Sequence, residues 1–118
     1  MIERLEQVAR RPVSRETFEK IEAYVALLRD ESGRQNLIAA STLDELWDRH
    51  IVDSAQLVRF EPRSGASWVD IGSGAGLPGV VIACLVDGPV KMVEPRRLRA
   101  DFLHKLCESL HLNATVFL

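Results

Sequence analysis

The fold of this chain is decided by the stretch from residue 68 to residue 79, which reads Trp68-Val69-Asp70-Ile71-Gly72-Ser73-Gly74-Ala75-Gly76-Leu77-Pro78-Gly79. A short apolar run ends in an acid, three glycines alternate, and a proline precedes a second apolar run. Glycines remove side chains where a ligand would approach the backbone, and they let the chain turn sharply after a strand. A helix that begins there leaves N–H groups facing the ligand. The stretch therefore predicts a strand, a nucleotide-type binding loop and a helix.

The residues after this loop predict two more strands. Strands are expected at 66–71, at 90–94 and from residue 114 onward, with a helix at 96–111 whose inner face carries Leu98, Phe102, Leu106 and Leu110. Asn113 is expected to end that helix in the left-handed conformation. Alternating strands and helices imply parallel pairing with right-handed crossovers, so residues 63–118 form the first half of a doubly wound α/β sheet. Because the chain stops inside an apolar strand, we expect a fragment whose C-terminal half of the sheet is missing.

The residues before the loop predict a helical segment, 1–62. A short helix is expected at 1–10, and Ser14 is suited to cap a second helix. The apolar stripe of that second helix is Phe18, Ile21, Val25 and Leu28. Thr42 and Glu45 have the spacing of a capping box that would open a third helix. A linker at 61–65 then separates the helical segment from the α/β unit.

Composition narrows the class of protein. The chain has 118 residues, the size of one domain, and its net charge of −2 gives no general attraction to nucleic acid. A nucleic-acid partner would need a local basic patch, for which Arg96, Arg97, Arg99 and Lys105 are the candidates, and the alternative is a solvated helix face. The three histidines have no clustered spacing, so we expect no metal. We expect no membrane span, and the two cysteines read as free thiols in a reducing cytoplasm.

Two kinds of cofactor fit the loop, and the charge of Asp70 separates them. Glu94 follows the second strand, where a carboxylate accepts hydrogen bonds from ribose hydroxyls in nicotinamide or S-adenosylmethionine sites. Gly74, Gly76 and Gly79 match the dinucleotide spacing G-x-G-x-x-G. An acid at the strand end, however, repels a diphosphate and attracts the ammonium and sulfonium groups of S-adenosylmethionine. The sequence therefore favours the methyl donor.

Three blocks in this order resemble one known family. They are Asn36-Leu37-Ile38-Ala39, Arg49-His50-Ile51-Val52-Asp53-Ser54 and the stretch from Asp70 to Gly79. Together they resemble the RsmG (GidB) family, the glucose-inhibited division protein B family of bacterial 16S rRNA guanine-N7 methyltransferases. The resemblance covers nearly the whole chain and is more specific than the glycine loop alone.

The resemblance implies a fold, an activity and a site. The fold is a set of N-terminal helices beside a Rossmann-like methyltransferase sheet, and the activity transfers a methyl group from S-adenosylmethionine to N7 of a guanine in 16S rRNA of the small ribosomal subunit. With Asp70 from the charge argument, the cofactor-binding residues are Gly72, Gly74, Gly76, Leu77 and Glu94. Asn36 and His50 would lie near the cofactor and the target base. The family's usual threonine is Ile38 here, which loses a hydroxyl.

Two other functions stay open, half of an NAD-dependent dehydrogenase and a non-catalytic nucleotide-binding or interaction module. For the fragment itself we expect little or no methyl transfer. The first strand would be central in a complete methyltransferase sheet, so residues 67–71 would show an unpaired apolar edge here. We expect this edge to be hidden by dimerisation or exchange of segments.

Overall fold

The computed structural model describes all residues, 1–118, and places every strand in the second half of the chain. The helices of the first half are α1 (Ile2–Ala9), α2 (Arg15–Glu31), α3 (Ala40–Leu43), the π-helical turn η1 (Leu46–Ile51), α4 (Val52–Gln56) and the 3₁₀ turn η2 (Leu57–Phe60). The second half contains β1 (Trp68–Ile71), α5 (Gly79–Leu85), β2 (Val90–Val93), α6 (Arg97–Ser109) and β3 (Ala114–Phe117). No helix combines the length and hydropathy needed to cross a lipid bilayer.

The strands form one parallel sheet in the order β1-β2-β3. Trp68 lies beside Val90 and Ile71 beside Val93 in the first pairing, and Val93 lies beside Phe117 in the second. The carboxyl ends of all strands therefore meet at one edge of the sheet. The glycine loop leaves from this edge, which is where ligands bind in open α/β sheets.

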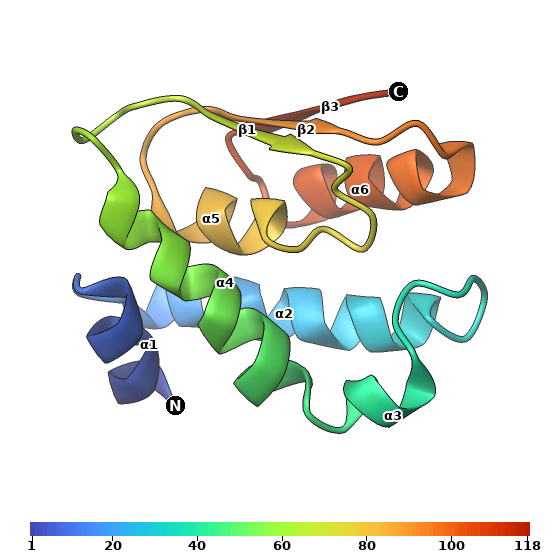
Figure 1. Cartoon of the computed structure of the whole chain (residues 1–118), viewed down its shortest axis with the longest axis horizontal. Coiled ribbons are helices and arrows are strands. Elements are labelled where there is room, and N and C mark those ends of the chain that lie inside the picture. Colours follow the sequence, from blue (N-terminus) through green and yellow to red (C-terminus); the bar gives the residue numbers. More distant parts are fainter.

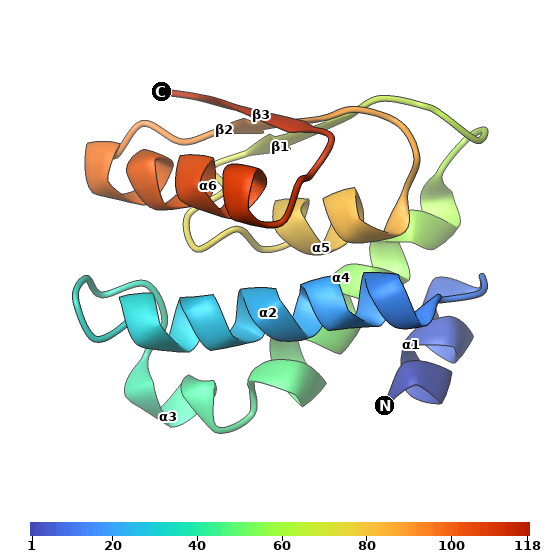
Figure 2. The ribbon, with the colours of Figure 1, turned by 180° about the vertical axis from the view of Figure 1, so that it is seen from behind.

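Figures 1 and 2 show three layers, with the sheet above, α5 and α6 beneath it, and α1 to α4 at the bottom. The connections from β1 to β2 and from β2 to β3 both step across the sheet in the same direction. Because such crossovers are right-handed, both of their helices must lie on the same face of the sheet. One face is therefore covered and the other is bare, and the α/β fold class predicted from the sequence is confirmed.

One apolar core joins the helical segment to the α/β unit. The predicted stripe of α2, which is Phe18, Ile21, Val25 and Leu28, is buried, and so are most side chains of α5. Ser14 caps α2 as predicted, since its hydroxyl accepts a hydrogen bond from the N–H of Thr17 at 3.1 Å. The division of the chain between residues 62 and 63 stays a prediction, because the core is continuous across it.

Three local predictions were wrong. Thr42 lies inside α3 and caps nothing, because α3 begins after Ala39 and a π-helical turn follows it. Leu98 is 68% exposed, since it lies in the first turn of α6, beyond the part of the helix that faces α2. The left-handed residue after α6 is His111, with a φ of 52°, rather than Asn113.

The bare face of the sheet carries large apolar side chains. Val69 and Ile71 of β1 are 61% and 82% exposed, and Phe117 of β3 lies in line with Ile71 and is also exposed. The lateral edge of β1 is free as well. Trp68 donates its N–H to the carbonyl of Pro89, just before β2, and Gly72 donates its N–H to the carbonyl of Val93 at the end of β2. The N–H groups of Val69 and Ile71 therefore point away from β2.

Tyr24 connects the helical segment to the glycine loop. Its side chain is fully buried, and its hydroxyl donates a hydrogen bond to the carbonyl of Ala75 at 2.9 Å. Burial raises the pKa of Tyr24 well above its ordinary value, so the hydroxyl keeps its proton and remains a donor. A helix of the lower layer thereby holds the loop that extends from the upper one.

We expect Tyr24→Phe to lower the free energy of unfolding by about 1–3 kcal/mol, because the buried carbonyl of Ala75 loses its donor. Urea unfolding at pH 7 measures this, with Ser41→Ala, an exposed hydroxyl, as the control. Wild-type stability should also fall above pH about 10, where the unfolded chain releases a tyrosine proton that the folded chain keeps. The variant should show a shallower fall, because it keeps the contribution of buried Cys84, and equal profiles would contradict the burial of the Tyr24 hydroxyl.

Candidate functional site

The glycine loop curls back toward the sheet because alternate residues adopt positive φ angles. The φ angles of Gly72, Gly74 and Gly76 are 76°, 55° and 98°, a region that L-residues with side chains rarely enter. Gly72 and Ser73 both donate their N–H groups to the carbonyl of Val93, at 2.8 and 3.2 Å. The loop is thus fastened to the end of β2.

The glycines of the loop serve two different purposes. A Cβ atom on Gly72 would meet no atom within 4 Å, and one on Gly74 would meet only the carbonyl of Gly72 at 3.9 Å. A Cβ on Gly76 would lie 2.8 Å from Val80, and one on Gly79 would lie 2.6 Å from the Asp70 carboxylate. Gly72 and Gly74 therefore leave open space for a ligand, while Gly76 and Gly79 allow close packing.

The side chain of Asp70 joins the two ends of the glycine loop. Its Oδ2 accepts a hydrogen bond from the N–H of Gly79 at 3.0 Å, at the start of α5. Burial raises the pKa of Asp70 more than its hydrogen bonds lower it, and the nearby charge of Glu94 raises it further. The carboxylate thus binds an N–H group at the start of α5, the kind of group that binds phosphates in dinucleotide sites.

Glu94 holds the other side of the loop. The side chain is only 3% exposed, and its two oxygens accept hydrogen bonds from Gly74 at 2.7 Å and from Arg96 at 2.9 Å. Each carboxylate oxygen can accept a second hydrogen bond, so the group retains capacity for a hydroxyl of a ligand. Glu94 therefore links the glycine loop to the start of α6.

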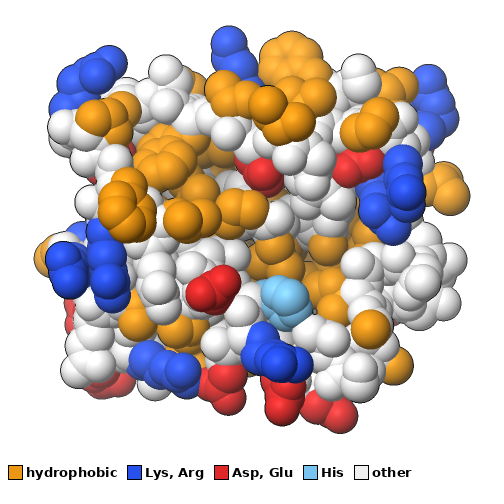
Figure 3. Space-filling model, viewed as in Figure 1, with side chains coloured by type: hydrophobic (Ala, Val, Ile, Leu, Met, Phe, Trp, Pro, Cys, Tyr) orange, Lys and Arg blue, Asp and Glu red, His pale blue; other side chains and the backbone are white.

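Figure 3 shows a face of the molecule that is hollowed near its middle, with hydrophobic side chains gathered above the hollow. His50, Leu77 and Pro78 line one pocket of about 320 Å³ between the helical segment and the loop. Asn36 lies elsewhere, in a pocket of about 400 Å³ with Arg96, Arg97 and Arg99. The structure thus brings His50 to the glycine loop and Asn36 to the arginines, in different pockets.

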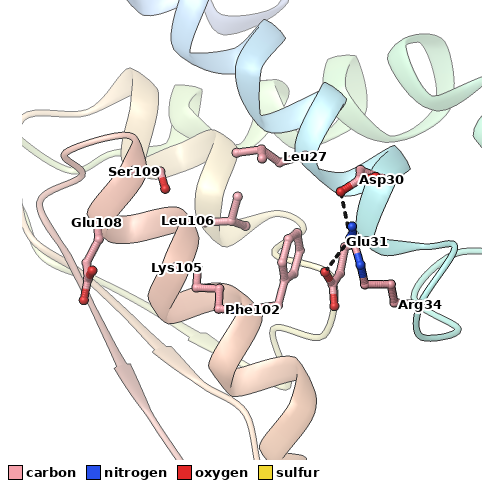
Figure 4. A pocket seen from close by; sticks show the side chains of 9 residues that line it. All are labelled: Leu27, Asp30, Glu31, Arg34, Phe102, Lys105, Leu106, Glu108 and Ser109. Carbon is pink, nitrogen blue, oxygen red and sulfur yellow. Dashed lines mark hydrogen bonds and ion pairs between the residues drawn. The ribbon is translucent and has the colours of Figure 1, made fainter.

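The basic cluster predicted from the sequence is smaller than expected. Arg96, Arg97 and Arg99 gather at the start of α6, none of them in an ion pair, and Arg99 donates to the carbonyl of Asn36 at 3.2 Å. Lys105 lies further along α6, in a cleft against α2. Figure 4 shows this cleft, where Asp30 and Glu31 both pair with Arg34. None of the residues of this cleft belongs to the glycine loop, so the cleft lies apart from the site.

The structure brings together no group of three or more His, Cys, Asp or Glu side chains that could hold a metal ion. Cys84 and Cys107 are both free thiols, and each is partly buried. Burial raises the pKa of Cys84 to about 12, so this thiol stays protonated.

Sequence reasoning missed two residues that the structure brings to the site. Tyr24 supports Ala75 of the loop, and Asp53 lines the pocket that contains His50. Tyr24 had a detectable signal, since it lies three residues after Ile21 on the same helical stripe and is the only tyrosine. Asp53 had one as well, since it belongs to the block from Arg49 to Ser54 that carries the family resemblance, but no role was assigned to it because a lone acid on a helix is most often solvated.

A parallel sheet with a glycine loop after its first strand and a buried acid after its second defines a Rossmann-like α/β unit with a nucleoside-type site. Comparison with protein families identifies the family to which this unit belongs. Residues 17–118 match the family described as GidB, rRNA small subunit methyltransferase G, and the chain belongs to this family.

Curated relatives carry the same description. A ribosomal RNA small subunit methyltransferase G of Zymomonas mobilis is 48% identical over 112 residues, which cover 88% of this chain and 51% of that protein. Proteins of the same name from Sphingopyxis alaskensis and Rhizorhabdus wittichii are 48% and 51% identical, over 85% and 83% of this chain and 43% and 46% of theirs. The chain spans about half the length of the curated relatives it matches.

We expect Asp70→Asn to resist urea better than the wild type at pH 7, because the folded chain disfavours the ionised carboxyl that the variant removes. A raised pKa means that stability is lost as the pH rises from about 4 through the pKa of the folded state. The difference should therefore narrow as the pH is lowered toward 4. Asp101→Asn, an exposed acid on α6, is the control. Lower stability of the variant at pH 7 would show that the bond to Gly79 outweighs burial.

Proposed function

We propose that this chain binds S-adenosylmethionine over its glycine loop and, in the protein of its family, directs a methyl group to N7 of a guanine in 16S rRNA. The observation that carries the proposal is the use of the loop's N–H groups. Gly74 donates to Glu94 and Gly79 donates to Asp70, so these two N–H groups already bind carboxylates of the chain itself. A ligand without phosphates suits such a loop.

The charges of the site support a cationic ligand. Asp70 and Glu94 lie on either side of the loop, and no lysine or arginine side chain bonds to either carboxylate. Two acids attract the ammonium and sulfonium groups of the methyl donor and repel the diphosphate of a dinucleotide. The same observation disfavours the dehydrogenase alternative.

The loop glycines, Leu77 and Glu94 have separate roles in this proposal. Gly72 and Gly74 let the ligand approach the backbone, because the space above them is open. Leu77 would face the methionine side, and Glu94 would use its remaining lone pairs for the ribose hydroxyls. Gly76 would shape the loop from within the core, where it packs against Val80.

The chemistry demands alignment more than proton transfer. Guanine N7 has a free lone pair, and S-adenosylmethionine supplies an electrophilic methyl group when bound. The chain's task is therefore to hold the base in line with the loop and to exclude water, and no general base is required. In this proposal His50 contacts the base, and the pocket that it shares with Leu77 beside the loop supports this role.

The arginines of α6 provide the contact with RNA in this proposal. Arg96, Arg97 and Arg99 are free of ion pairs and share a pocket with Asn36. Guanidinium groups at a helix start favour phosphate. Their partner would be the backbone of 16S rRNA in the small ribosomal subunit, which places the protein in the cytoplasm.

We expect the chain to bind S-adenosylhomocysteine and not NAD, measured by isothermal titration calorimetry. Gly74→Ala should weaken this binding at least tenfold, because the added methyl group lies where the ligand approaches the backbone. Gly65→Ala is the matched control, since Gly65 also has a positive φ and open space but lies in the linker. Both variants should lose about 1 kcal/mol of stability from strain alone.

The outcomes separate the three candidate functions. Binding of NAD would support the dehydrogenase reading. Binding of neither ligand, or equal affinity in Gly74→Ala and wild type, would leave the loop as a tight turn in an interaction module. Methyl transfer itself is followed with labelled S-adenosylmethionine and small ribosomal subunits.

We also propose that two copies of this chain pair through β1. The edge of β1 presents unpaired backbone groups beside the exposed side chains of Val69 and Ile71. Free edges of this kind pair readily with another strand. Two β1 strands related by a two-fold axis would join both sheets into one continuous sheet.

Sedimentation velocity should therefore show a dimer that grows with concentration. Ile71→Lys should shift the chain to monomer, because a charge on an edge strand opposes pairing. Leu98→Lys, which changes an equally apolar and similarly exposed residue on α6, should leave the dimer intact. A monomeric wild type at every concentration would rule the pairing out.

A further inference from the structure

The pocket that contains His50 adjoins the glycine loop, and the cofactor proposal does not use most of it. The pocket of about 320 Å³ lies between the helical turns that follow α3 and the start of α5. Its walls include His50, Asp53, Leu57, Phe60, Leu77 and Pro78. Because Leu77 and Pro78 belong to the loop itself, whatever binds here lies directly beside the cofactor site.

The apolar wall of this pocket is exposed. Phe60 is 75% exposed and Leu57 is 39% exposed. Phe60 is an available aromatic ring, whereas Trp47 is stacked on Phe18 with ring centroids 5.7 Å apart. An exposed ring beside a polar group is a platform on which a flat ligand can stack.

The polar wall contains an acid that has no partner. Asp53 is exposed and makes no hydrogen bond or ion pair, and His50 in the same pocket makes none either, while the charged residues on the neighbouring turns are paired. Arg4 pairs with Asp48, Arg49 pairs with Glu45, and the guanidinium of Arg59 donates to the carbonyl of Val8. No lysine or arginine lines the pocket, so it has no permanent positive charge to pair with a phosphate.

These walls define the ligand by its chemistry. A ring that stacks on Phe60 and binds both oxygens of the carboxylate with its edge must carry two adjacent hydrogen-bond donors. Guanine has such a pair in N1–H and the N2 amino group, whereas adenine presents an acceptor at N1, which a carboxylate repels. Enzymes that act on an extruded base read it in this way, by its Watson–Crick edge and by stacking.

We propose that this pocket receives the target guanine, with Asp53 accepting hydrogen bonds from N1–H and N2 and with Phe60 stacking on the ring. N7 lies on the other ring of the purine, so this pairing leaves it uncovered. Asp53 is thereby the residue that selects guanine over adenine, a specificity role distinct from cofactor binding. The inference rests on the proposed function for the identity of the reaction.

The test is titration of the ¹⁵N-labelled chain with nucleosides, followed by NMR, with and without saturating S-adenosylhomocysteine. Nucleosides have no phosphate, so the arginines of α6 do not contribute. We expect guanosine to shift the amides of Asp53, Phe60 and Leu77, with affinity falling in the order guanosine, inosine, adenosine, because inosine lacks the N2 amino group.

Two variants separate hydrogen bonding by Asp53 from stacking on Phe60. Asp53→Asn should weaken guanosine binding about tenfold or more and abolish the preference over adenosine, since a bidentate pair is lost. Phe60→Ala should weaken all three nucleosides about tenfold and keep their order. Asp101→Asn on α6 is the control and should change neither affinity nor order.

The outcomes distinguish this inference from the proposed function. If S-adenosylhomocysteine binds but guanosine is not preferred, or if Asp53→Asn keeps the preference, the base pocket is wrong and the cofactor site stands. If guanosine binds with the expected order while S-adenosylhomocysteine does not bind, the pocket stands and the cofactor proposal fails.

Discussion

The site depends on one hydrogen bond, from the N–H of Gly79 to the carboxylate of Asp70. This bond closes the loop by joining the end of β1 to the start of α5, and it requires that Gly79 have no side chain, because a Cβ would lie 2.6 Å from the carboxylate. It also places a negative charge where the helix dipole would otherwise attract a phosphate. Loop shape and ligand charge are therefore set by the same contact.

The handedness of the crossovers determines the rest of the architecture. Since α5 and α6 must lie on one face of the sheet, they form a layer whose lower side is apolar and needs a cover. The stripe of α2 provides that cover, and Tyr24 lies within it, so the same packing that buries the helices brings a hydroxyl to Ala75. The helical segment is thus part of the site's construction as well as of its core.

Sequence reasoning succeeded where the signal is local. The strands, the glycine loop and the α2 stripe follow from periods of two or three to four residues and from the turn preference of glycine, so their order and type were predictable. It failed where neighbouring signals compete. Thr42 and Glu45 have the spacing of a cap, but the chain around them forms a short helix and a π-helical turn.

Contacts between distant residues were beyond reach for a different reason. The bond from Tyr24 to Ala75 spans 51 positions, and Asp53 shares a pocket with Leu77 only because the layers stack. No short-range pattern encodes such a meeting. For Glu94 the sequence predicted a carboxylate that binds a ligand, which stays a prediction. The structure shows that its oxygens accept hydrogen bonds from the N–H groups of Gly74 and Arg96, which the sequence did not predict.

The hydroxyl of Tyr24 makes α2 and the glycine loop a single mechanical unit. A ligand that immobilises the loop must also damp the motions of α2, and amide hydrogen exchange in that helix should then slow although no atom of the ligand touches it. Because binding free energies are linked reciprocally, a partner that binds α2 should change the affinity of the loop for its ligand by the same factor as the ligand changes the affinity for that partner. Binding at α2 can therefore change the affinity of a site that α2 itself does not line.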